Sequence, residues 1–135
     1  MNYWLIKQEP DKYSFDDLLK DGKTDWTGVR NFQARNNLQA MRIGDKVLFY
    51  HSVSEKAVIG VAEVSRESFS DATDEANKWI AVEIKPLEKF EKPVSLDQIK
   101  TNENLQNIAL IRQSRLSVMP LSEIEFKIIL SLANN

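Results

Sequence analysis

The segment 26–36, "WTGVRNFQARN", gathers an indole, a glycine, two guanidinium groups and two asparagines within eleven residues. Gly28 allows a backbone conformation, or a close approach, that a Cβ atom would forbid. The helix that follows begins with free backbone N–H groups and a positive dipole end, which suit a carbonyl or a phosphate. The face of Trp26 can stack against a flat ring, and Asn31 has the donor and the acceptor needed for a base edge. Two arginines can hold a phosphate: Arg30 and Arg35.

The same residues have a purely structural interpretation. Trp26 can belong to the core, Asn31 can cap the helix, and both arginines can lie in solvent. For Trp26 taken alone, the core is the better interpretation. The density of the motif favours a binding site, and its occupant would be a nucleobase with its phosphates.

A second motif, "FYHS", ends an apolar run at residues 49–52. Side chains alternate along a strand, so Phe49 and His51 face one side while Tyr50 and Ser52 face the other. His51 can be a hydrogen-bond partner or a general base, because imidazole titrates near neutral pH. A lone histidine satisfied by backbone groups is the structural alternative. Ser52 diverges from His51 and lacks a nucleophile-elbow pattern, so no hydrolase triad is expected.

Acidic residues near the N-terminus offer little acid–base chemistry. Asp16 and Asp17 fit the first turn of a helix, where the dipole stabilises them. Glu9 follows the first expected strand and stays a candidate. Trp79 lies on a later strand, where it can be core or pocket wall. No phosphate-binding or dinucleotide fingerprint is present.

Composition limits the classes of function. The 135 residues fit one domain, 1–135, and the absence of cysteine together with a single histidine gives no basis for disulfides, a thiol nucleophile or a multi-histidine metal site. We expect no metal and no cofactor. The net charge of −2 means that any contact with nucleic acid is local. We expect no membrane contact, a monomer, and a cytoplasmic location, or a nuclear one if the source is a eukaryote.

Periodicity predicts short strands separated by loops and isolated helices. Strands are expected at 2–7, 46–52, from 58, from 79 and near 116–120, and helices at 14–22, 31–41 and 122–132, with short helical structure after Pro93. The inner faces of the last two long helices are expected to include Phe32, Leu38, Met41, Ile124, Ile128, Ile129 and Leu132. Strands and helices do not alternate strictly, so the fold class is α+β: a small, curved, mixed or antiparallel barrel flanked by helices.

Several motifs in order along the chain resemble the EVE domain family. They are "YWLIKQEP", "WTGVRNFQARN", "GDKVLFYHS", "IGVAEV", "WIAVEI" and "LIRQSRLSVMP". The resemblance covers almost the whole chain and implies the curved barrel of the PUA-like superfamily. It also implies a domain that binds DNA or RNA and holds a modified base, either of the 5-methylcytosine type in DNA or a modified base in RNA.

The resemblance assigns site residues by position in the motifs. The central motif supplies Trp26, Val29, Arg30, Asn31, Arg35 and Asn36; the strand motif supplies Tyr50, His51 and Ser52; further signature positions are Lys7, Glu9, Trp79, Arg115 and Ser117. Two departures stand out. Phe32 replaces a common tyrosine, and the loop 70–78 is shorter than the insert of many members.

Three functions follow, in order of preference. The first is a reader of one modified nucleobase, with binding that depends only weakly on salt. The second is a nuclease or hydrolase that uses His51, Lys7 and Glu9. The third is a protein-interaction module whose aromatic side chains form a cage for a peptide or a methylated side chain.

Overall fold

The computed structural model describes residues 1–134, so Asn135, the last residue of the expected domain, lies outside the described residues. Six strands form one mixed sheet in the order β2-β5-β4-β3-β1-β6. The strands are β1 (Tyr3–Gln8), β2 (Thr24–Trp26), β3 (Lys46–His51), β4 (Ala57–Ser70), β5 (Ile80–Ser95) and β6 (Val118–Leu121). β1 and β3 are parallel, and the other neighbours are antiparallel.

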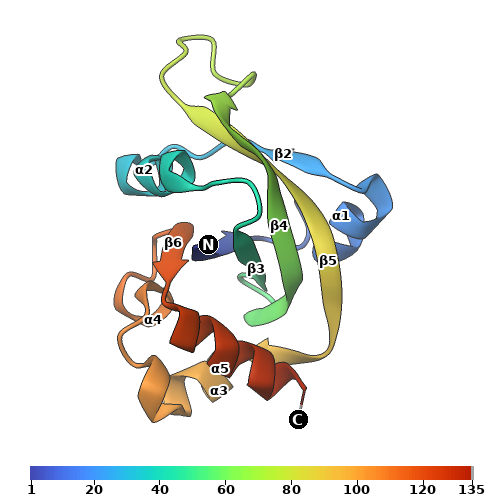
Figure 1. The fold of residues 1–135 in the computed structure, drawn as a ribbon, viewed down its shortest axis with the longest axis vertical. Helices are drawn as coiled ribbons and strands as arrows, with labels where there is room; N and C mark the ends of the chain where they lie inside the picture. The colour runs from blue at the N-terminus through green and yellow to red at the C-terminus, as the bar shows by residue number, and fades with distance from the viewer. Residues whose placement is uncertain (135) are drawn as a thin grey trace.

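Five helices and one 3-10 turn accompany the sheet (Figure 1). They are α1 (Phe15–Asp21), α2 (Phe32–Ala40), α3 (Leu96–Thr101), the turn Glu103–Leu105, α4 (Ala109–Arg112) and α5 (Glu123–Ala133). Figure 1 shows α3, α4 and α5 grouped at the end of the molecule nearest β6, whereas α1 lies beyond β5 on the other side. Both α1 and α5 contact β5.

The α+β class is confirmed, but the sheet does not close. In the described residues, β2 pairs only with β5 and β6 pairs only with β1, so two edges stay open. Closure of a barrel needs the first and last strands to share a hydrogen-bonded ladder. Here the edge strands have three and four residues, which gives them little backbone to offer such a ladder.

Helix ends follow the sequence closely. Ser14 and Asp17 form a capping box at α1, and Gly22 ends this helix with a left-handed φ of 80°. A second capping box, formed by Ser122 and Glu125, begins α5. These local signals predict helix limits because each satisfies backbone groups that a helix end leaves unpaired.

Two predictions about inner helix faces are wrong. Phe32 is 57% exposed and Ile124 is 69% exposed. Both lie in the first turn of their helix, ahead of the first buried residue of that helix. The buried residues of α2 are Ala34 and Leu38, with Met41 just after it, and those of α5 are Phe126, Ile129 and Ala133.

The β4–β5 hairpin is longer than the sequence suggests, with 14 and 16 residues in its strands. Its register shifts at several points, one of them where Val61 faces Glu88 and Ala62 faces Pro86. Pro86 therefore lies beside a bulge, which is one of the places where a strand accommodates a proline. Pro93 lies inside β5, so helical structure begins only after Ser95.

Candidate functional site

A buried carboxylate joins the loop after β2 to the loop between β4 and β5. The side chain of Asp71 is fully buried. Its Oδ2 accepts hydrogen bonds from the Gly28 N–H at 2.8 Å and from Nη1 of Arg30 at 3.0 Å. Its Oδ1 accepts from the backbone N–H and the hydroxyl of Thr73 at 2.7 and 2.6 Å. We call this arrangement the Asp71 clamp.

The clamp fixes both backbone and charge. Gly28 has φ of 81°, a left-handed conformation that favours glycine. Burial alone would raise the pKa of the Asp71 carboxyl, but the hydrogen bonds from Thr73, Gly28 and Arg30 outweigh it and lower this pKa to about 2. Arg30 was predicted to hold a phosphate, whereas its guanidinium donates to Asp71, to Thr73 and to the Val29 carbonyl.

An aromatic pair lies on the outside of the clamp. The rings of Phe32 and Trp79 have centroids 4.9 Å apart with an angle of 34° between planes. Nζ of Lys78 lies 4.9 Å from the Phe32 centroid and 5.5 Å from the Trp79 centroid. Nε of Arg35 donates to the Lys78 carbonyl at 3.0 Å. Trp79 thus forms an external pair that links α2 to the β4–β5 loop.

Trp26 is a core residue with only 5% of its surface exposed. Its ring contacts Phe49 at 5.4 Å and Tyr13 at 6.3 Å between centroids, in both cases edge to face. The structural interpretation of Trp26 is therefore the one observed, and only a small part of its surface remains exposed. Val29 and Tyr50 are buried as well.

His51 is held by two hydrogen bonds and is 4% exposed. Its Nε2 accepts from the Phe15 N–H at 3.1 Å, and its Nδ1 lies 2.8 Å from Oε1 of Glu55. Since a backbone N–H can only donate, Nε2 carries no proton and Nδ1 donates to the carboxylate. Both ring nitrogens are engaged, so His51 links β3 to the start of α1.

The end of β1 is tied to the segment that precedes β6. The Lys7 ammonium donates to the Ser114 carbonyl at 2.7 Å, and the Lys7 N–H donates to the Ser117 carbonyl at 2.9 Å. Partial burial lowers the pKa of the Lys7 ammonium. Its hydrogen-bond acceptor is a neutral carbonyl, which leaves the positive charge uncompensated.

Two hollows of about 350 Å³ each meet at Ser114. One lies between Asn31, at the start of α2, and Arg115, before β6. The other is lined by residues including Lys7, Tyr50 and Ser52. We call the two together the Ser114 groove. It brings together five of the predicted site residues, which lie far apart in the sequence.

A smaller hollow of about 160 Å³ lies beside Trp26. Its lining residues are Gln8, Tyr13, Thr24, Asp25, Trp26 and Thr27. The Tyr13 hydroxyl donates to Asp21 at 2.8 Å, and burial raises the pKa of this phenol to about 12. We call this site the Trp26 hollow. Consecutive strand residues face opposite sides, so Gln8 lines it while Lys7 lines the Ser114 groove.

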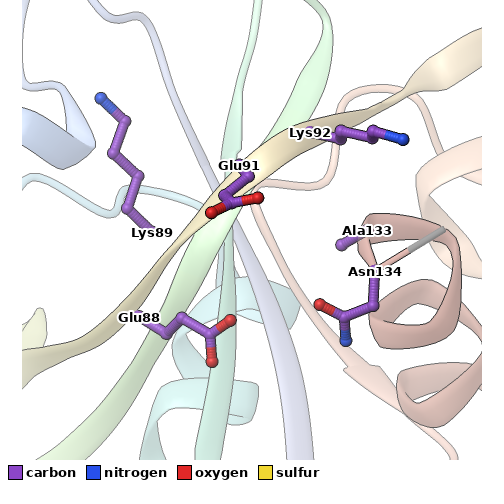
Figure 2. Close-up of a pocket in the computed structure, with 6 residues that line it drawn as sticks. All are labelled: Glu88, Lys89, Glu91, Lys92, Ala133 and Asn134. Atoms are coloured by element: carbon purple, nitrogen blue, oxygen red, sulfur yellow. The ribbon is translucent and has the colours of Figure 1, made fainter.

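The remaining predicted residues lie outside these hollows. Glu9 pairs with Lys12 at 2.9 Å, and Asn36 is exposed on α2. A further hollow of about 470 Å³, between β5 and the end of α5, contains no predicted site residue. Figure 2 shows Glu88 and Asn134 facing one another across it.

Sequence reasoning missed Asp71, Ser114, Gln8 and Tyr13. The spacing of Asp71 and Thr73 is typical of an Asx turn, whose side chain bonds to the backbone two residues on. That signal could have identified the turn, but not its partner Gly28, 43 positions away. Ser114 contributes through its carbonyl, which no side-chain pattern reveals.

Residues 1–134 contain neither a cluster of metal-ligating side chains nor a membrane-spanning helix. In this part of the chain, no three histidine, aspartate or glutamate side chains are placed to hold a metal ion. None of the helices described is both long enough and apolar enough to cross a bilayer.

The open mixed sheet, with hollows around the end of β1, defines an α+β binding domain. The family model for the EVE domain matches residues 2–132, and the chain belongs to this family. It is 33% identical to thymocyte nuclear protein 1 of Rattus norvegicus over 165 residues, covering 97% of this chain and 73% of the relative.

Solved structures agree with this assignment. A crystal structure of a protein from Agrobacterium tumefaciens is 43% identical with a TM-score of 0.96, over 98% of this chain and 93% of that one. The crystal structure of human THYN1 protein in complex with 5-methylcytosine containing DNA is 31% identical with a TM-score of 0.94. This likeness covers 100% of our chain and 99% of the human one.

Proposed function

We propose that this protein is a reader that binds DNA and holds one modified base, with 5-methylcytosine as the leading ligand and a modified RNA base as the alternative. The observation that carries the proposal is the likeness, over the full chain, to human THYN1 protein in complex with 5-methylcytosine containing DNA. An identity of 31% with a TM-score of 0.94 over the full chain means that the two proteins share their overall fold, which supports a shared kind of ligand. If the source is a eukaryote, we propose a nuclear location as well.

Within this proposal, the base enters the Trp26 hollow. A cavity of roughly 150 Å³ is large enough for a benzene-sized ring, and this hollow measures about 160 Å³. It combines two aromatic side chains, Tyr13 and Trp26, with the amide of Gln8 and the hydroxyl groups of Thr24 and Thr27. A pocket for a base needs apolar walls and a few polar groups for its edge. The Ser114 groove is wider and has fewer aromatic walls.

The test is a fluorescence titration at one stated salt concentration. Trp26 lines the hollow and Trp79 is partly exposed near the clamp, so intrinsic tryptophan fluorescence serves as the reporter. The ligands are single-stranded and duplex oligonucleotides with cytosine, 5-methylcytosine, 5-hydroxymethylcytosine or N6-methyladenine, as DNA and as RNA. We expect tighter binding to one modified base than to its unmodified parent. Equal affinity across the panel would overturn the proposal.

Two variants test where the base binds. Tyr13→Leu removes an aromatic wall of the Trp26 hollow, and we expect it to abolish the preference for the modified base. Asn31→Ser removes an amide from the Ser114 groove but keeps an oxygen that can cap α2 in place of Oδ1, which accepts from the Ala34 N–H at 2.9 Å. We expect this variant to keep the preference. The reverse result would move the base into the Ser114 groove.

The other functions receive less support from the contacts. In an enzyme, His51 would need a free ring nitrogen, whereas both of its nitrogens are engaged. Glu9 is paired with Lys12 instead of Lys7. Nothing in residues 1–134 favours a peptide over a nucleobase as the ligand of the aromatic side chains.

A further inference from the structure

We propose that the Ser114 groove is the track for the sugar–phosphate backbone of the bound strand. This inference rests on the proposed function, because it concerns the same ligand. Four cationic side chains line the groove: Lys7, Lys56, Arg112 and Arg115. No aspartate or glutamate is among its lining residues. The chain as a whole has 20 acidic and 18 basic residues, so this separation of charge is a local feature.

The charges in the groove are not neutralised by carboxylates. Lys7 donates to the Ser114 carbonyl, and Nε of Arg112 donates to the Gln106 carbonyl at 2.9 Å. Neither Lys56 nor Arg115 forms an ion pair within the described part of the chain. By contrast, Lys12, Lys23, Arg30, Lys46, Lys85, Lys89 and Lys127 each pair with an acid. A polyanion would therefore meet four uncompensated positive charges here.

The geometry gives the track two defined limits. At one end it begins beside Asn31, where the first backbone N–H groups of α2 add positive potential. At the other end, the next hollow is lined by Glu55 and Asp97 as well as by Lys56 and Lys100, so its charges balance and it offers a phosphate no net positive charge. The favourable charge is confined to the stretch between α2 and Lys56.

The track also reaches the place proposed for the base. Lys7 lines the groove and its neighbour Gln8 lines the Trp26 hollow, on opposite faces of β1. The loop 26–31 borders the hollow at Trp26 and the groove at Asn31. A strand lying in the groove can thus turn one base past the end of β1 while its phosphates stay among the cations.

The experiment compares Lys56→Gln and Arg112→Gln with Lys20→Gln, a control on the exposed end of α1. Each variant is titrated with the same single-stranded oligonucleotide, modified or unmodified, between 50 and 200 mM salt. On a single strand, the plot of log K against log salt has a negative slope, and each lost phosphate contact makes this slope shallower by about 0.7. We expect this change in both groove variants, about twice as much in the double variant, and none in Lys20→Gln.

Base preference provides the second readout. Because phosphate contacts carry no sequence information, the groove variants should weaken binding to modified and unmodified strands by the same factor. They should not change affinity for the free modified nucleoside. Wild-type slopes in both groove variants would overturn the inference even if the modified base is preferred. A shallower slope without any base preference would support the groove as the backbone track but would refute the proposal that the protein reads a modified base.

Discussion

Asp71 holds the loop 26–31, which borders both the Trp26 hollow and the Ser114 groove. In Asp71→Asn, one oxygen can still accept from Thr73, but an amide NH2 group would face the donors Gly28 N–H and Arg30. Hydrogen bonds to a charged group contribute about 1.5–3 kcal/mol, and we expect a loss of this size in the free energy of unfolding by urea. Asp16→Asn is the control, since its carboxylate is exposed and pairs only at the surface with Lys89. Equal effects from both variants would contradict the clamp.

The clamp should also make stability depend on pH. The pKa of the Asp71 carboxyl is about 2 in the folded protein and near its ordinary value of 3.8 in the unfolded chain. The unfolded chain therefore binds the proton first, and folding is favoured above pH 3.8. This contribution should disappear as the pH falls through about 2. Between pH 5 and pH 2, the melting temperature should fall more steeply for the wild type than for Asp71→Asn.

His51 is expected to act through the fold. His51→Ala leaves the Phe15 N–H buried without its acceptor, which costs about 1–3 kcal/mol. We expect lower stability towards urea, with the preference for a modified base retained in the folded variant. Loss of this preference at unchanged stability would instead give His51 a direct role with the ligand.

At the scale of the elements, Gly60 sets how closely α1 packs on the sheet. A Cβ atom at this position would lie 2.5 Å from the Glu88 carbonyl oxygen and 2.7 Å from the Phe15 ring. Overpacking of this kind typically costs about 1–3 kcal/mol. Gly60→Ala should therefore lower the midpoint of urea unfolding. The neighbouring reverse substitution, Ala62→Gly, should also destabilise the fold, but without a steric clash. Relief of the Gly60→Ala effect by Phe15→Leu would identify the aromatic contact as its cause.

Sequence patterns predicted elements better than the site. Ser14, Gly22 and Ser122 act on neighbouring backbone, so their effect is visible in the sequence. The length of β5 was missed because Pro93 was expected to begin helical structure, whereas it lies inside the strand, where the register with β4 shifts. The partners of Asp71 and Lys7 were hidden because pairing over 43 and 107 positions depends on the folded sheet.

At the scale of the whole molecule, both sheet edges discourage self-association. β2 has three residues, and β6 has four with Pro120, which lacks an N–H donor. Open edges so short give another chain few groups with which to pair. We therefore expect the mass of one chain in analytical ultracentrifugation across micromolar concentrations. A dimer that resists dilution would require a different interface.

The hairpin between β4 and β5 is closed by a main-chain bond as well as by the clamp, since the Asp71 N–H donates to the Trp79 carbonyl at 3.0 Å. The residues between these two positions span a gap whose ends are already fixed. Doubling the length of such a loop costs only about 0.6 kcal/mol of closure entropy. Asp74 must be kept, because its Oδ2 accepts from the Lys78 N–H and the Trp79 N–H at 2.7 Å. A peptide tag or a binding epitope grafted between Ala76 and Asn77 should therefore leave Asp71, Trp79 and the sheet beneath them in place. The tip of this hairpin offers a natural position for adding new specificity to the domain.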